Sequence, residues 1–229
     1  MKYEVTKRAT FMERPNRFLA RVRLDHGRVE TVHVKNTGRC RELLQPGATV
    51  ILEEAAQTGR KTRYSLVAVY KGTMLVNIDS QAPNTVVYEA LGKKLLPEFA
   101  DIEGLAREVK YGASRFDLSY ETLSTRGFIE VKGVTLEENG IALFPDAPTE
   151  RGAKHLQELA AAVRAGYEGC IFFLIQMKGP RCFRPHKEMD AAFAEALQVA
   201  KEAGVKVLAY DSLVTEEGMT MGDPIEVQI

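Results

Sequence analysis

The stretch SRFDLSYETLSTRGFIEVKGVTL, residues 114–136, sets charged side chains into two segments that otherwise have the pattern of buried β-strands. Side chains alternate between two faces along a strand. In 128–136 both faces carry apolar residues, as in a strand covered on each side. Glu130 and Lys132 lie side by side on one of these faces. Because burying a charge is costly without a partner or a metal, the conflict points to a functional site.

The upstream segment repeats this conflict, since Asp117 stands between two large hydrophobic residues. A hairpin of 115–121 with 128–136 would bring Asp117 beside Glu130 and Lys132. Two carboxylates and an ammonium suit a hard divalent cation, Mg²⁺ or Mn²⁺, with Lys132 next to a metal-bound water. The alternative is a purely structural cross-strand ion pair. Glu89, on a preceding predicted helix, would add another acid to the metal site, or is simply an exposed helix residue.

The composition is that of an ordinary globular protein: 229 residues, 45% hydrophobic and 27% charged, with zero net charge. Charge is unevenly distributed, with 15 Lys and Arg against 8 Asp and Glu in residues 1–80. A basic N-terminal part and an acidic C-terminal part fit a polyanion-binding module joined to a metal-binding one. The alternative is that these charges belong to ordinary solvated surfaces.

Three cysteines, without the paired spacing of a zinc site, predict reduced thiols. The polar N-terminus does not resemble a signal peptide, and the longest apolar run, 170–175, is too short to span a bilayer. These features predict a cytoplasmic protein with no membrane contact.

Residues 17–80 predict about five short strands separated by turns, at 18–24, 29–34, 48–53, 64–70 and 73–78. Such a set suggests a small barrel of the OB-fold type, a common nucleic-acid-binding module. Arginines on one strand face and basic residues in the loops would contact nucleic acid, namely Arg17, Arg21, Arg23, Lys35 and Arg39. The alternative is that these side chains only keep the domain soluble.

A boundary near residues 81–84 divides the chain into an OB-fold-like domain, 1–82, and a second domain, 83–229. Asn84 is the predicted N-cap of a helix to about residue 95. Further strands are expected at 105–111, 141–144, 169–177 and 205–210, and helices from 149 or 150 to 165 and over 190–203, with at best one short strand after 216. This order predicts an α/β (α+β) domain in which a mixed sheet is flanked by helices.

Basic residues crowd the start of the helix that begins near residue 149, namely Arg151, Lys154 and His155. Free backbone amides at a helix start, together with these side chains, would contact a phosphate of nucleic acid. The alternative is an N-cap followed by solvated charges, with His155 a hydrogen-bonded core residue.

Asp117 followed by Glu130-Val-Lys132 is the arrangement typical of the PD-(D/E)xK nuclease superfamily. The chain also resembles the sugar fermentation stimulation protein family through five motifs: NTGR at 36–39, EVKYG at 108–112, SRFD at 114–117, IEVKGVTL at 129–136 and FPDAPTERGAKHLQEL at 144–159. The resemblance implies an OB-fold joined to a nuclease-like domain, and a DNA-binding role associated with the regulation of maltose and other sugar metabolism. The nuclease pattern falls on Asp117, Glu130 and Lys132, all intact.

Together these patterns predict a protein that binds DNA without sequence preference and hydrolyses phosphodiesters with a divalent metal. The alternative is a non-cleaving DNA-binding regulator that uses the nuclease fold as a platform. An enzyme of sugar metabolism is disfavoured, because the sequence has no sugar-phosphate or nucleotide loop. The oligomeric state stays open, with a homodimer allowed.

Overall fold

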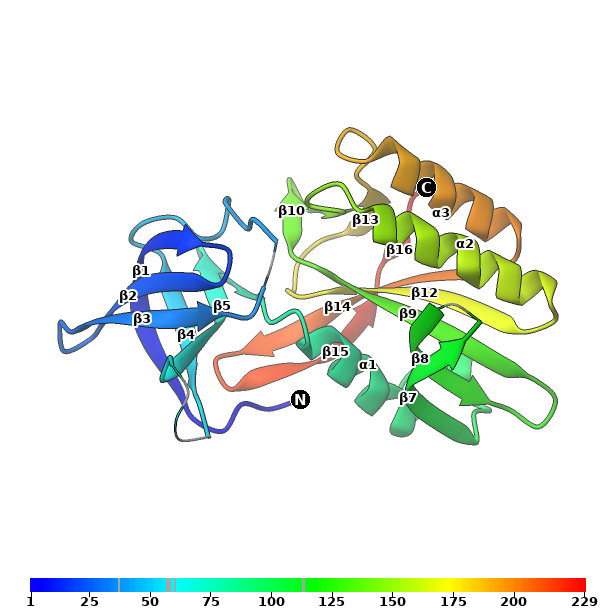
Figure 1. Ribbon diagram of the computed structural model, residues 1–229, viewed down its shortest axis with the longest axis horizontal. Helices are drawn as coiled ribbons and strands as arrows, with labels where there is room; N and C mark the ends of the chain where they lie inside the picture. The colour runs from blue at the N-terminus through cyan, green and yellow to red at the C-terminus, as the bar shows by residue number, and fades with distance from the viewer. Residues whose placement is uncertain (37, 57–58, 60, 113) are drawn as a thin grey trace.

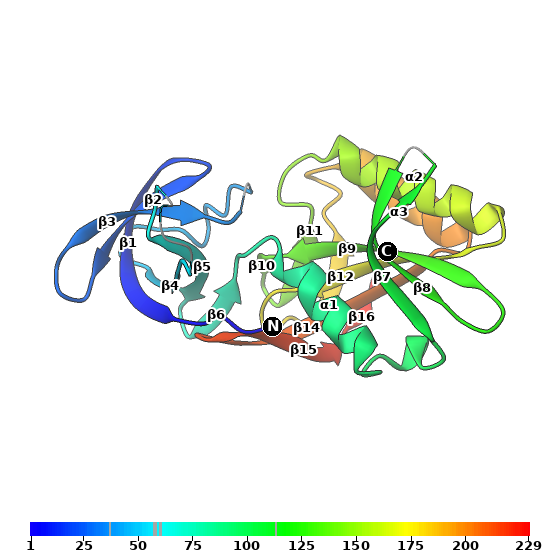
Figure 2. The ribbon, with the colours of Figure 1, turned by 60° about the horizontal axis from the view of Figure 1, so that its bottom comes forward.

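In the computed structural model the chain forms two lobes, a β-barrel and a larger domain built on a mixed sheet (Figures 1 and 2). The structure describes residues 1–36, 38–56, 59, 61–112 and 114–229. The fold class expected from the sequence is confirmed. No helix in these ranges has the length and apolar character needed to cross a membrane.

The barrel is made of five strands: β1 Thr6–Asn16, β2 Leu19–Leu24, β3 Val29–Val34, β4 Thr49–Glu54 and β5 Tyr64–Lys71. Their order is β3-β2-β1-β4-β5, and a parallel pairing of β3 with β5 closes the ring. Along β2, buried Ala20, Val22 and Leu24 alternate with exposed Arg21 and Arg23. The period of two therefore places the apolar face inside and the arginines in solvent.

The sequence analysis missed one barrel strand, and one strand that it predicted correctly lies outside the barrel. The first barrel strand, β1, was not predicted, because its polar sequence TKRATFMERPN lacks a clean alternation. The predicted strand at 73–78 corresponds to β6 Met74–Asn77, which pairs only with β5 and leads out of the barrel.

The second domain is centred on a sheet with the order β15-β14-β12-β9-β8-β7. Its strands are β7 Gly104–Tyr111, β8 Ser114–Glu121, β9 Arg126–Val134, β12 Glu168–Ile175, β14 Lys206–Thr215 and β15 Gly218–Pro224. β12 runs parallel to β9 and β14, whereas β7, β8 and β9 form antiparallel hairpins. The sheet is therefore mixed, as predicted. The hairpin of β14 and β15 replaces the single short strand expected at the end of the chain.

Helices cover both faces of this sheet (Figure 1). α1 Ala82–Gly92 and the short 3₁₀ helix η1 Pro97–Phe99 lie on one side, and α2 Glu150–Arg164 and α3 Ala191–Glu202 lie on the other. Thr149 and Asp190 cap α2 and α3 by accepting hydrogen bonds from backbone amides of the first turn. A small sheet adjoins α3, with the order β10-β11-β13-β16 and the strands β10 Leu136–Glu138, β11 Ile141–Phe144, β13 Cys182–Pro185 and β16 Glu226–Val227.

The predicted cap of α1 was wrong. The helix starts at Ala82 with Gln81 at its N-cap, no side chain caps it, and it ends at Gly92 rather than near residue 95. Pro83 in the first turn explains the early start, because proline lacks the amide that a cap would satisfy. Asn84 is thus inside the helix, where its side chain is free for another partner.

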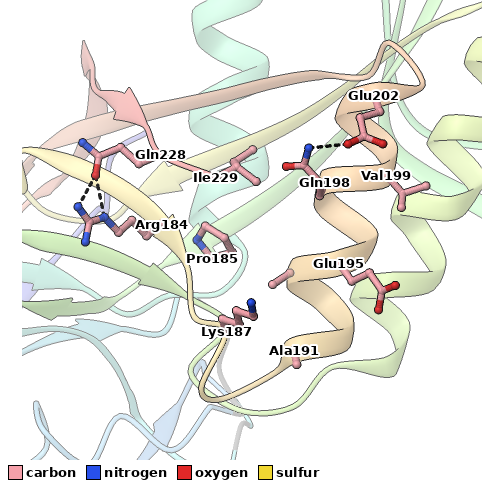
Figure 3. Close-up of a pocket in the computed structure, with 11 residues that line it drawn as sticks. Arg184, Pro185, Lys187, Ala191, Glu195, Gln198, Val199, Glu202, Gln228 and Ile229 are labelled. Atoms are coloured by element: carbon pink, nitrogen blue, oxygen red, sulfur yellow. Dashed lines mark hydrogen bonds between the residues drawn. The ribbon is translucent and has the colours of Figure 1, made fainter.

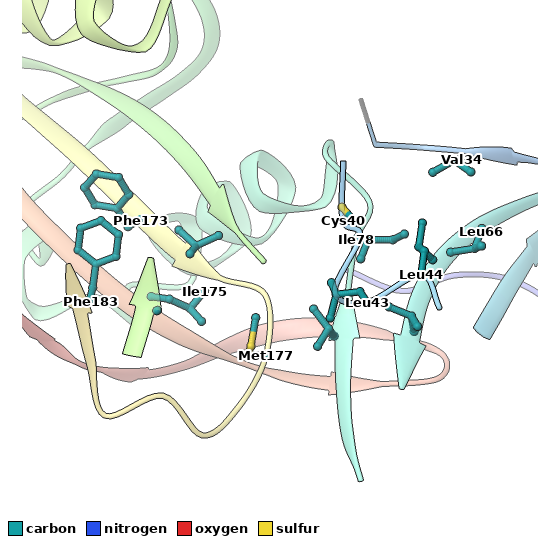
Figure 4. Packing of buried hydrophobic residues seen from close by; sticks show 14 of the residues in the cluster. Val34, Cys40, Leu43, Leu44, Leu66, Ile78, Phe173, Ile175, Met177 and Phe183 are labelled. Carbon is teal, nitrogen blue, oxygen red and sulfur yellow. The ribbon is translucent and has the colours of Figure 1, made fainter. Parts of the chain in front are cut away.

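The two lobes share one continuous hydrophobic cluster (Figure 4). Leu43 and Ile78 from the barrel side face Ile175, the last residue of β12, and Met177 just beyond it. Buried polar groups join the lobes as well, since the Gln176 amide donates to Asn77 Oδ1 at 3.0 Å and to the Asp79 carbonyl at 3.1 Å. The barrel and the large domain are therefore packed as one unit. The junction contacts β9 through Gln176, whose backbone amide donates to the Val134 carbonyl at the end of that strand.

Candidate functional site

Strands β8 and β9 bring the predicted acids together. Their register pairs Leu118 with Ile129, so Asp117 and Glu130 lie next to each other where the two strands separate. There the Asp117 side chain, rather than a backbone carbonyl of β8, accepts a hydrogen bond from β9. The Val131 amide donates to Asp117 Oδ2 at 2.8 Å. The hairpin predicted from the sequence is therefore present, with the acids at its open end.

Glu130 is the buried centre of the site, with 2% of its surface exposed. Its Oε1 accepts a hydrogen bond from Lys132 Nζ at 2.7 Å and contacts His155 Nδ1 of α2. Its Oε2 is buried and has no hydrogen-bond partner in the described part of the chain. Since buried carboxylate oxygens normally have partners, this oxygen is available to a water or to a bound ligand.

The electrostatics of the two carboxyl groups differ. Burial raises the pKa of Asp117, and the nearby charge of Glu130 raises it further, against hydrogen bonds from Val131 and Asn84. Burial also acts to raise the pKa of Glu130, but hydrogen bonds from His155 and Lys132 outweigh it, so this pKa falls below its usual value. Ionising both acids therefore creates a repulsion that a bound cation would relieve.

Neither Asn84 nor Glu89 on α1 has the role expected of it from the sequence. The Asn84 side-chain amide donates to Asp117 Oδ1 at 2.8 Å, so this predicted helix cap belongs to the site. The Glu89 carboxylate instead pairs with the amino group of Met1 at 2.8 Å. The structure therefore places an amide, rather than the acid at residue 89, beside Asp117.

Of the three basic residues at the start of α2, His155 is buried, whereas Arg151 and Lys154 are exposed. His155 is 8% exposed and contacts Glu130, and Arg151 Nε donates to its Nε2 at 3.4 Å. Because Nε2 accepts the hydrogen bond from Arg151, the proton of the His155 ring lies on Nδ1, where it faces Glu130. Lys154 is solvent-exposed and pairs with Glu158 at 3.8 Å. His155 thus contacts the acidic site, whereas Lys154 stays available to a ligand in solvent.

The basic residues of the barrel are also in different situations. Lys35 is tied to Glu53 at 2.6 Å and to Asp79 at 3.1 Å, so it stabilises the junction and is not free to bind a ligand. Arg21 pairs with Glu13 at 2.9 Å on the exposed face of β2, and Arg23 is exposed on the same face. Arg17 and Arg39 instead line a pocket of about 280 Å³ together with two arginines that the sequence analysis did not select, Arg14 and Arg41.

Of the other hollows, one lies along α3 and one lies between the lobes. The larger has a volume of about 720 Å³ and lies along α3, between Val199, Pro185 and Ile229, away from the acids (Figure 3). The other, about 310 Å³, is a cleft between the lobes, with walls from Asn36, Ser80, Gly133 and 145–149. The second is lined by Gly133, the residue after Lys132 in β9, and neither hollow is lined by Asp117, Glu130 or Lys132 themselves. The structure describes no group of three His, Cys, Asp or Glu side chains positioned to hold a metal ion.

Comparisons with known proteins agree with this architecture. A family model described as the SfsA N-terminal OB domain matches residues 12–78, and one described as the sugar fermentation stimulation protein RE domain matches residues 81–218.

Relatives of similar length cover almost the whole chain. A sugar fermentation stimulation protein homolog of Alkaliphilus oremlandii is 53% identical, covering 99% of this chain and 98% of its own length. A homolog of Desulfitobacterium hafniense (strain Y51) is 51% identical, covering 100% and 99%. The structure of Pyrococcus furiosus SfsA in complex with Ca²⁺ superposes with a TM-score of 0.91 at 31% identity, covering 100% of this chain and 98% of that one. The chain therefore belongs to the sugar fermentation stimulation protein family.

Proposed function

We propose that this protein is a metal-dependent nuclease that binds DNA without sequence preference and hydrolyses phosphodiester bonds at Asp117, Glu130 and Lys132. The observation that carries the proposal is the buried, unpartnered Oε2 of Glu130 beside a second carboxylate whose pKa is raised. Buried acids clustered with a lysine are more often functional than structural.

The residues present fit a hard divalent cation, Mg²⁺ or Mn²⁺. Asp117 and Glu130 would hold it, and two carboxylates suffice for Mg²⁺, which keeps several of its waters. The cation would supply Lewis-acid activation of a phosphate oxygen and of a water. The Pyrococcus furiosus relative was solved with Ca²⁺, which has the same preference for oxygen ligands.

The protein's own groups have separate tasks. Lys132 Nζ, held by Glu130, would orient the attacking water and offset negative charge on the phosphate. His155 would fix the Glu130 carboxylate, since its second nitrogen is itself engaged by Arg151. Glu89 has no task in this scheme, because it pairs with Met1.

The barrel would supply the affinity for DNA. Arg17, Arg23 and Arg39 are exposed, and exposed arginines bind phosphates regardless of sequence. We keep the division into an OB-fold-like domain, 1–82, and a nuclease-like domain, 83–229. Three buried cysteines without disulfides fit a reducing compartment, so we place the protein in the cytoplasm. Because the relatives are called sugar fermentation stimulation protein homologs, we further propose a role in the regulation of sugar metabolism.

One observation favours the alternative, a DNA-binding regulator that does not cleave. Both Asp117 oxygens and the Glu130 Oε1 are already satisfied by protein groups. In this alternative the acidic cluster stabilises the fold, and the nuclease-like domain acts only as a platform for binding.

The experiment that separates the two proposals is a cleavage assay. Single-stranded, linear and supercoiled DNA are incubated with the protein in Mg²⁺, Mn²⁺ or EDTA, beside Asp117→Ala and Lys132→Ala. Lys206→Ala is the matched control, because Lys206 is also a strand lysine paired with a glutamate, Glu168. Metal-dependent cleavage lost in the two site variants and kept in the control supports the nuclease. Binding without cleavage in every condition leaves the regulator.

A further inference from the structure

We propose that the substrate of this site is a single polynucleotide strand, gripped on the barrel by a base stacked on Phe18 and by phosphates on Arg17, Arg39 and Arg41, and led through the cleft between the lobes. The inference rests on the proposed function for what happens at the acidic site. Its binding part stands on the barrel and the cleft alone.

The first observation is an exposed aromatic ring next to exposed cations. Phe18, in the turn between β1 and β2, has 51% of its surface exposed, and the Arg17 guanidinium carbon lies 5.7 Å from its ring centroid. Aromatic rings beside a basic groove are how sequence-tolerant single-strand binders hold unpaired bases. A base pair inside a duplex offers no free face to such a ring, so Phe18 favours a single strand.

The second observation is how the arginine pocket is built. Arg14 donates to the carbonyls of Arg17, Asn36, Gly38 and Arg39 at 2.7–2.8 Å. Its charge therefore holds the loop, and it is a scaffold rather than a ligand-binding group. The side chains of Arg17, Arg39 and Arg41 are exposed around the same hollow. Three exposed guanidinium groups around one hollow suit phosphate oxygens.

The third observation is that the pocket and the cleft are neighbours. Gly38 lines both of them, and the cleft is also lined by Gly133, the residue after Lys132. The cleft has a volume of about 310 Å³, the size of a small-molecule site. Its one charged wall residue is Asp146, so a strand would pass with sugars or bases, rather than phosphates, toward that carboxylate.

The fourth observation is that the cleft cannot easily widen. The lobes are joined behind it by buried hydrogen bonds from Gln176 and by the shared hydrophobic cluster. On the barrel side, Asn36 Nδ2 donates to the Ile78 carbonyl at 2.9 Å and fixes the start of the loop. A cleft of about 310 Å³ that is held in this way is too small to enclose a duplex, so we infer that only a single strand enters it.

The test measures binding in EDTA, so that cleavage plays no part. Fluorescently labelled 12-nucleotide single strands, as DNA and as RNA, and a blunt DNA duplex of the same sequence are titrated by anisotropy. We expect at least one of the two single strands to bind at least tenfold more tightly than the duplex. The comparison of the DNA strand with the RNA strand shows which sugar the protein prefers. Phe18→Leu should weaken this binding about fivefold or more, whereas Phe18→Tyr should keep it.

Arg39→Ala with Arg41→Ala should lower the slope of log affinity against log salt by about 0.7 for each phosphate that the variant no longer neutralises. Arg28→Ala is the control, because Arg28 is an exposed barrel arginine paired with Glu30. A fluorophore on the new thiol of Ala147→Cys reports entry into the cleft, since all three native cysteines are buried. The label should respond to the single strand and not to the duplex.

Equal affinity for duplex and single strand, no loss in Phe18→Leu, or a label that ignores the bound strand would overturn the inference. These outcomes are independent of the nuclease proposal. Selective binding of the single strand without cleavage in any metal would refute the nuclease and leave the inference standing. Duplex binding with metal-dependent cleavage would do the reverse.

Discussion

Replacing His155 by alanine tests whether α2 positions the buried carboxylate of the site. The substitution removes one of the two protein groups on Glu130 Oε1 and leaves Lys132 on it. Glu130 is 2% exposed, so water replaces the missing partner poorly. Losing a hydrogen bond to a buried charged group costs about 1.5–3 kcal/mol, which sets the expected loss in the free energy of unfolding.

The assay is urea denaturation in EDTA at neutral pH, with a double-mutant cycle between His155→Ala and Glu130→Gln. If His155 acts through the Glu130 charge, the two changes should be coupled by about 1–2 kcal/mol. His26→Ala is the matched control, because His26 is exposed in a turn and its loss should stay within about 0.5 kcal/mol. His155→Gln keeps a hydrogen-bond donor, so its free energy of unfolding should fall less than that of His155→Ala.

Two results would refute the reasoning. One is a His155→Ala variant as stable as His26→Ala, and the other is a cycle that is additive within about 0.5 kcal/mol. Either would mean that His155 packs beside Glu130 without supporting its charge.

The same region of the molecule supports three further predictions. Ca²⁺ or Mn²⁺ at one hundred times its dissociation constant should raise the free energy of unfolding by about 2.7 kcal/mol. EDTA should reverse this gain, and Glu130→Gln should abolish it. A gain in stability that persists in Glu130→Gln would mean that the ion binds elsewhere. Burial acts to raise the pKa of Glu137, but hydrogen bonds from Lys71 and the Gly140 amide lower it on balance, so its stabilisation is present above pH ~4.3 and is lost as the pH falls through the lowered folded-state pKa. Glu137→Gln should therefore cost about 1–2 kcal/mol at pH 7 and little at pH 3, and an equal cost at both values would contradict this. Gly133→Ala should destabilise the protein by about 1–3 kcal/mol, because the new Cβ would lie 2.3 Å from the Gln176 side-chain oxygen. Gly92→Ala is the control, since open space surrounds Gly92 and no loss is expected. Thermal unfolding of both variants measures the difference.

The acids of the site could be predicted because their signal is local. Strand alternation fixes the face of Glu130 and Lys132, and one short hairpin is enough to bring Asp117 to them. The helices α2 and α3 were predictable for the same reason, since Thr149 and Asp190 cap them within one turn.

The partners of these acids could not be predicted, because they depend on how distant elements pack. Asn84 has good chemistry for a helix cap, yet the proline before it starts the helix earlier and leaves its amide for Asp117. Glu89 and Lys35 look like free charges in the sequence, but each meets an opposite charge from far along the chain. Only the periodicity of α2, which groups residues three and four apart, hinted that His155 shares a face with the apolar core.

The barrel and the acidic site depend on each other through one residue. Gln176 follows the last residue of β12, and its backbone amide donates to the Val134 carbonyl at the end of β9. Its side chain holds Asn77 and Asp79, which lead out of the barrel, and its oxygen packs against Gly133. A displacement of the barrel would therefore move the end of β9 at Val134, two residues from Lys132. For this reason the barrel is part of the scaffold that places Lys132, and we expect a chain cut between the lobes to lose the geometry of the site.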